Sequence, residues 1–212
     1  QDEPLLAWDQ VRFAGERVAA VCADDADIAT IAAALIQVDY EELTPMLSAA
    51  EALAPHAPII HPDFNSYGGV IPIASPSNAY GHITLAAGNT TAGFADADVI
   101  VERTYESPRI HQMYFEPHAC LVSFDADDTA QVWVASGTPG VNHLEVARLL
   151  GIPPGQIVFN FSLLGGSYGG KTDGTEVAIC YLLARRTGRS VRFLADYAEE
   201  FTSMHPRNPS II

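Results

Sequence analysis

Basic side chains are scarce in this sequence. Lysine and arginine together number 11, against 26 aspartate and glutamate residues, and the formal net charge is −15. Nucleic-acid surfaces depend on clustered lysine and arginine side chains that contact phosphates, so we expect no nucleic-acid partner. An anionic ligand would have to be held by backbone N–H groups instead.

Long apolar runs and a signal peptide are also lacking. No run approaches the roughly 20 residues that a bilayer-spanning helix needs, so we expect no membrane segment. The first residues, QDEPLLAWDQ, have neither the basic nor the apolar region of a signal peptide. They also lack an initiator methionine, which we expect for a processed subunit or for a piece of a longer chain.

Cysteine is rare, with only Cys22, Cys120 and Cys180, and no CxxC pair occurs. This number and spacing indicate neither a zinc ribbon nor a disulfide framework. Each cysteine lies in an apolar or strand-like stretch, which favours small buried side chains in a reducing compartment. We therefore expect a cytoplasmic protein.

Helix and strand patterns follow one another along the chain and predict an α+β fold. The 212 residues, 48% of them hydrophobic, suffice for one large domain or two small ones. A passage rich in proline and glycine, from residue 55 to about residue 89, predicts a linker or a draped loop. Strands are predicted at residues 17–23, 36–43, 99–105, 120–124, 131–135, 157–163 and 191–196, and helices at residues 24–37, just before residue 99, and at 142–150 and 175–187.

The strongest local motif is the glycine-rich segment Gly165–Thr172 (GGSYGGKT), between a predicted strand and a predicted helix. Four glycines allow close approach of the backbone to a ligand, and successive N–H groups form an anion site. The segment also matches the phosphate loop of nucleoside triphosphatases, with Asp196 as a candidate magnesium acid. Only 40 residues follow Thr172, too few to build the parallel sheet of such a protein, so the triphosphatase is an alternative hypothesis.

The segment His111–Cys120 holds two histidines, a glutamate and a cysteine, but their spacing matches no zinc or iron site. We predict that it forms a pocket wall and that no residue of the chain ligates a metal directly. The acidic pair Glu199 and Glu200 is predicted to be ordinary surface charge.

Four segments, residues 3–43, 92–125, 132–171 and 176–193, together resemble the molybdenum hydroxylases, the xanthine dehydrogenase and aldehyde oxidase family, in the family's order. The resemblance covers nearly the whole chain. It implies a partial α/β-hammerhead domain at residues 1–57, a linker at 58–88, and the first part of the molybdopterin-binding domain at 89–212. It also implies hydroxylation of an aldehyde or N-heteroaromatic substrate with water.

The same resemblance implies a molybdenum–pterin cofactor, in its cytosine dinucleotide form, with 2Fe–2S clusters and FAD on partner subunits. The expected partners are the remaining molybdopterin-binding segment or subunit, an iron–sulfur subunit and an FAD subunit in a hetero-oligomer, and a small-molecule substrate. The catalytic glutamate base is expected beyond this chain, which leaves no catalytic residue within it. The implied cofactor-binding residues are Gly165, Gly166, Ser167, Gly169, Gly170 and Gly137, and the implied substrate-pocket residues are Tyr168, Thr172, Phe115 and Glu116.

The chain departs from the family pattern at several of these positions. Gly137 stands where the family has a glutamine, and Ser167-Tyr168 stand where it has Gly-Phe. Thr172 replaces the glutamate of xanthine-type members, which disfavours purine oxidation. A further alternative is therefore a non-catalytic assembly module with a decayed site. Because half of the expected pocket is absent from the chain, we also expect an exposed apolar surface.

Overall fold

The computed structural model describes residues 3–68, 70–73 and 77–212, which divide into two compact units. The larger unit comprises Leu5–Gln37 and Glu106–Ile211, and the smaller one consists mainly of Val38–Tyr105. Among the described residues, no helix is long and apolar enough to cross a membrane.

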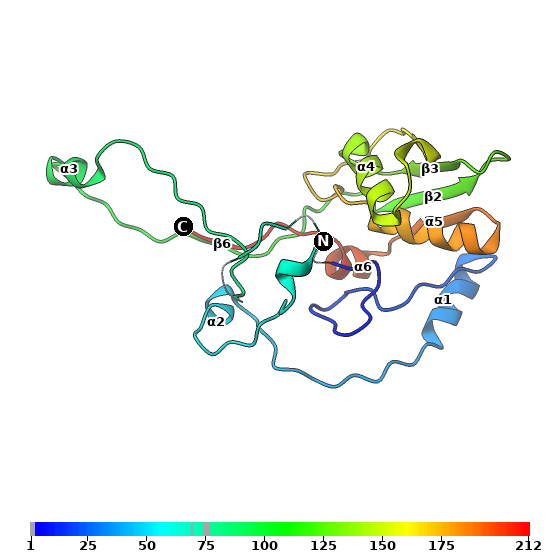
Figure 1. The fold of residues 1–212 in the computed structure, drawn as a ribbon, viewed down its shortest axis with the longest axis horizontal. Helices are drawn as coiled ribbons and strands as arrows, with labels where there is room; N and C mark the ends of the chain where they lie inside the picture. The colour runs from blue at the N-terminus through cyan, green and yellow to red at the C-terminus, as the bar shows by residue number, and fades with distance from the viewer. Residues whose placement is uncertain (1–2, 69, 74–76) are drawn as a thin grey trace. The chain divides into compact units, whose positions relative to one another are not determined.

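A four-stranded sheet organises the larger unit, in the order β4-β3-β2-β5. Its strands β2 and β3 are labelled in Figure 1. Strands β2 (Ala119–Phe124) and β3 (Ala130–Val134) form the predicted antiparallel hairpin, and β5 (Val191–Leu194) continues it antiparallel to β2. Strand β4 (Ile157–Asn160) runs parallel to β3 and is shorter than the predicted span 157–163. The combination of this mostly antiparallel sheet with helices is the predicted α+β class.

The predicted helices of the larger unit are confirmed. Helix α1 (Ala26–Ala34) begins at the predicted cap Asp25 but ends three residues before the predicted end at residue 37. Helix α4 (Pro139–Leu150) starts three residues earlier than predicted because Pro139 occupies its first turn. Helix α5 (Thr175–Thr187) has the predicted bounds. A short 3-10 turn, η2 (Pro154–Gln156), leads into β4.

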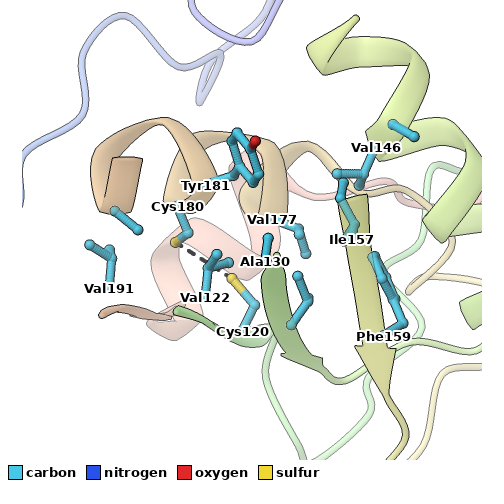
Figure 2. Packing of buried hydrophobic residues seen from close by; sticks show 13 residues of the cluster. Cys120, Val122, Ala130, Val146, Ile157, Phe159, Val177, Cys180, Tyr181 and Val191 are labelled. Carbon is cyan, nitrogen blue, oxygen red and sulfur yellow. Dashed lines mark hydrogen bonds between the residues drawn. The ribbon is translucent and has the colours of Figure 1, made fainter. Parts of the chain in front are cut away.

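One face of the sheet packs against α4 and α5 to form the core (Figure 2). Alternate residues of β2 and β3 point into this core, so that Val122 and Val132 are fully buried. Cys120 and Cys180, predicted to be small buried side chains, are free thiols there, with their Sγ atoms 3.5 Å apart. The buried cluster consists of Cys120, Val122, Ala130, Val132, Val146, Ala147, Ile157, Phe159, Val177, Cys180, Tyr181, Ala184 and Val191.

The smaller unit has little regular structure. It holds the short helices α2 (Ala49–Ala52) and α3 (Thr90–Ala95) and the 3-10 turn η1 (Phe64–Ser66). Side-chain hydrogen bonds tie part of it together, because the Asn78 amide accepts from the Ile60 N–H at 2.9 Å and donates to two backbone carbonyls. The described part of the proline-rich passage is therefore irregular but specifically bonded.

Three predicted strands, at residues 17–23, 36–43 and 99–105, are wrong. Their backbones pair with no neighbouring strand in the described parts of the chain. A suitable alternation of side chains does not make a strand unless a partner accepts and donates the ladder hydrogen bonds. A two-stranded ladder that was not predicted joins β1 (Glu106–Ser107) to β6 (Ser210–Ile211).

Helix α6 (Tyr197–Ser203) was also not predicted, although its start is encoded locally. The Asp196 carboxylate accepts from the Glu199 N–H, and the Glu199 carboxylate accepts from the Asp196 N–H, which completes a capping box. Asp196 is therefore a helix cap and not the magnesium acid of the triphosphatase hypothesis.

The expected exposed apolar surface is present. On α1 and at its C-cap, Ile28, Ile31 and Leu35 are all at least half exposed. These side chains recur at a spacing of three and four residues and so share one face of the helix. Near α3, Phe94, Val99 and Val101 are also exposed.

Candidate functional site

The glycine-rich segment Gly165–Thr172 forms a loop between β4 and α5. Three of its residues have positive φ angles: Gly166 (+104°), Tyr168 (+49°) and Gly169 (+88°). Glycine adopts this region at little steric cost, whereas Tyr168 is strained there. Backbone strain of this kind persists only where the surroundings enforce it, and it is concentrated at functional sites.

The loop presents a run of backbone donors. Its inner bonds run from the Gly170 N–H to the Ser167 carbonyl at 2.8 Å and from the Lys171 N–H to Ser167 Oγ at 3.2 Å. Among the described residues, no acceptor takes the N–H groups of the four residues 166–169. At Gly169 no described atom lies within 4 Å of a Cβ position, so an anionic group has room to approach this part of the loop, whereas Tyr114 and Tyr168 lie 3.3 Å from a Cβ position at Gly166. The donor set therefore fits an anion, as the sequence predicted.

Lys171 is the buried end of this loop. Its side chain is 0% exposed, and Nζ donates to Glu116 Oε2 at 2.7 Å and lies 4.7 Å from the centre of the Tyr114 ring. A lysine that reaches a nucleotide phosphate has to be free to do so. In addition, α5 begins only at Thr175, after the cap Gly174, so the loop is not the first turn of that helix. The geometry gives the triphosphatase hypothesis no support.

Glu116, predicted for the substrate pocket, lies at the base of the loop. Besides Lys171, its Oε2 accepts from the Gly165 N–H at 2.9 Å. Partial burial raises the pKa of this carboxyl, but the hydrogen bonds from Lys171 and Gly165 and the lysine charge outweigh it, and the pKa lies below its ordinary value. Glu116 is therefore ionised at neutral pH, and its Oε2 already accepts hydrogen bonds from two residues of the loop.

Glu200, predicted to be surface charge, is fully buried, and that prediction is wrong. Its carboxylate accepts from the Tyr114 hydroxyl at 2.8 Å and from the backbone N–H of His118, and it lies 3.0 Å from His118 Nδ1. Burial raises the pKa of Glu200, yet these hydrogen bonds bring it below its ordinary value. Burial and the bond to Glu200 raise the pKa of Tyr114. The capping box of Asp196 and Glu199 signals only the start of the helix that carries Glu200, and not the burial of the Glu200 side chain.

Two departures from the family pattern are in contact. The Gly137 N–H donates to the Lys171 carbonyl at 2.9 Å, and a Cβ atom at position 137 would lie 2.7 Å from Ser167 Oγ. No side chain fits at position 137 while the Ser167 hydroxyl occupies this space. Glycine in place of glutamine at position 137 therefore leaves the space that serine in place of glycine at position 167 fills.

The remaining predicted pocket residues lie at the surface of the described structure. Phe115 is 93% exposed and Tyr168 75% exposed, and Thr172 is exposed as well. Within the described residues, no three histidine, cysteine, aspartate or glutamate side chains are arranged to hold a metal ion. The structure thus brings Glu116, Gly137 and the loop together and leaves the aromatic side chains open to solvent.

Glu176, at the start of α5, gives the larger unit an expected pH dependence. Burial and the charge of Asp173 raise its pKa to about 7, although Arg17 opposes the shift. At pH values between the pKa of Glu176 in the unfolded state and its pKa in the folded state, the folded protein keeps a proton that the unfolded protein releases. The free energy of unfolding therefore falls as pH rises through this window. Between pH 5.5 and 8 the loss amounts to about 2 kcal/mol.

The Glu176→Gln variant removes this titration. We expect its free energy of unfolding, relative to wild type, to improve by about 2 kcal/mol from pH 5.5 to pH 8. Urea unfolding at four pH values measures the difference, and Glu106→Gln, at an exposed position of the same unit, is the control. Parallel pH profiles for Glu176→Gln and wild type would contradict the assignment.

Comparison with known proteins places the loop inside a matched region. The family described as the molybdopterin cofactor-binding domain matches residues 72–212. The family described as the aldehyde oxidase and xanthine dehydrogenase a/b hammerhead domain matches residues 1–44.

Individual relatives agree with these matches. The probable hypoxanthine oxidase XdhD of Escherichia coli (strain K12) is 34% identical over 92% of this chain and 23% of its own length. The nicotinate dehydrogenase large molybdopterin subunit of Eubacterium barkeri is 30% identical over 99% of this chain and 46% of its own length. The solved aldehyde oxidoreductase from Desulfovibrio gigas superposes with a TM-score of 0.83 at 28% identity, over 98% of this chain and 22% of that one. The chain thus spans less than half the length of these relatives.

Proposed function

Because the chain belongs to the aldehyde oxidase and xanthine dehydrogenase family of molybdenum hydroxylases, we propose that it forms part of the molybdopterin-binding subunit of an oxidoreductase. The proposed reaction is hydroxylation of an aldehyde or an N-heteroaromatic ring with water. One observation carries the proposal: the N–H groups of residues 166–169, which have no acceptor among the described residues, lie within the region matched to the cofactor-binding domain. Among its relatives are a probable hypoxanthine oxidase and an aldehyde oxidoreductase.

The loop suits an anionic pterin because an acidic protein can hold such a group through backbone donors. The N–H groups of residues 166–169 would donate to it. Gly165, Gly170 and Gly137 would lie beside it, where their missing side chains let the backbone pack closely against Glu116, Tyr114 and Ser167. The molybdenum–pterin group supplies the oxidation–reduction chemistry when bound. The residues of this chain would bind the cofactor and orient the substrate. Tyr168 and Phe115 would contact the substrate, and Thr172 offers no carboxylate of the kind implied for xanthine-type members.

For the whole protein we propose the organisation that the family implies. Residues 1–57 would belong to the hammerhead domain, 58–88 to a linker, and 89–212 to the molybdopterin-binding domain. The remaining molybdopterin-binding segment, an iron–sulfur subunit with 2Fe–2S clusters and an FAD subunit would complete a hetero-oligomer and carry electrons away. The cofactor would be the cytosine dinucleotide form. Two relatives are themselves named as a large subunit or large chain.

Elemental and nucleotide analysis of the protein purified from its native host, with whatever co-purifies, tests this function. We expect stoichiometric molybdenum and a pterin-linked cytosine nucleotide. A complex that contains the long partner segment but no molybdenum would instead favour the non-catalytic assembly module. Tightly bound ATP or ADP without molybdenum would favour the triphosphatase.

A further inference from the structure

We propose that Glu116 and Lys171 are positioning residues, whose partly buried ion pair ties the two ends of the glycine-rich loop together and so holds residues 166–169 in the geometry that the cofactor requires. The inference rests on the proposed function for its ligand. Its structural part, that the pair sets the shape of the loop, is testable without any ligand.

A single oxygen atom makes both connections. Glu116 Oε2 accepts from the Gly165 N–H, at the start of the loop, and from Lys171 Nζ, at its end, at 2.9 and 2.7 Å. The two donors are six residues apart in the chain but converge on one acceptor. Because bonds to a charged acceptor are short and strong, they fix the separation of the loop ends.

Lys171 has no freedom to leave this position. It is 1% exposed, and its ammonium group lies above the Tyr114 ring, whose hydroxyl is held in turn by the buried Glu200. Its backbone is anchored as well, because its carbonyl accepts from the Gly137 N–H and its N–H donates to Ser167 Oγ. The ion pair thus packs on Tyr114, which the Glu200 side chain of α6 holds in place.

Stability alone does not explain why an ion pair occupies this place. Replacing a buried ion pair by apolar side chains is often neutral or stabilising, because desolvation costs as much as the attraction returns. What an apolar pair cannot supply is an acceptor for the Gly165 N–H. The strained backbone of Tyr168 between the two ends requires such external constraint.

The decisive variant is the double replacement Glu116→Leu/Lys171→Met in the protein as purified with its partners. It leaves no uncompensated buried charge, so we expect it to fold with a thermal midpoint near that of wild type. We expect molybdenum to be lost about tenfold faster during gel filtration, as the loss of one charged hydrogen bond implies. Hydrogen exchange of the amides in residues 165–171 should accelerate to a similar extent. Arg185→Met, which breaks the exposed ion pair with Asp128, is the matched control and should change neither quantity.

The outcomes separate this inference from the proposed function. Faster loop exchange together with molybdenum loss at an unchanged midpoint supports both. If the wild-type protein holds no molybdenum but loop exchange still accelerates in the variant, the function is overturned and the loop-holding role stands. Unchanged exchange and unchanged molybdenum retention in the double variant overturn the inference. A double variant that fails to fold overturns the inference and shows a purely structural role. The single variant Lys171→Met leads to the same conclusion if it loses the cofactor only in proportion to its loss of stability.

Discussion

Glu200→Ala is expected to lower the free energy of unfolding by about 3–5 kcal/mol, the cost of removing one partner from a buried charged network. The carboxylate is fully buried and accepts from the Tyr114 hydroxyl and the His118 N–H. Without it, both donors and the His118 ring lose their acceptor in a region that water does not reach. Urea or thermal unfolding of the chain measures the loss.

A matched control for this variant is Glu106→Ala, in the same unit, where the side chain is exposed. It should change stability by no more than about 0.5 kcal/mol. Because Tyr114 supports Lys171, Glu200→Ala should also increase hydrogen exchange in the glycine-rich loop. Equal stabilities of the Glu200 and Glu106 variants would show that the buried network does not form.

Gly15→Ala is expected to cost about 3 kcal/mol, the sum of a left-handed backbone penalty and a steric clash. Gly15 has a φ angle of +101°, and a Cβ atom there would lie 2.5 Å from the carbonyl carbon and oxygen of Thr202. The obstacle is backbone and cannot rotate away. Ser203 Oγ also donates to the Gly15 carbonyl at 2.8 Å, so the substitution would push away α6, the helix that carries Glu200.

Gly188→Ala separates the two contributions to this cost. Its φ angle is +66°, but no atom of the described residues lies within 4 Å of a Cβ atom at that position. It should therefore cost only about 1 kcal/mol, from the backbone conformation alone. Midpoints of urea unfolding for the two variants provide the comparison, and equal losses would mean that Gly15 does not pack against Thr202.

Local signals predicted those parts of the fold that depend on neighbours in the sequence. The bounds of α5, the cap Asp25 of α1 and the hairpin of β2 and β3 follow from periodicity, capping and turn residues. The predicted strands at residues 17–23, 36–43 and 99–105 failed because a strand requires a partner that no local pattern specifies.

For the candidate site, the sequence by itself determined the chemistry of the loop. Four glycines in six residues define a run of backbone donors open to an anion, and the order of the segments identified the family. Only the tertiary structure decided what surrounds the loop. Lys171 meets Glu116 across 55 residues and Glu200 meets His118 across 82, and both contacts depend on burial. Local pattern encodes helix caps and glycine freedom, whereas the pairing of buried charges is set by the packing of distant elements, where desolvation makes each partner necessary.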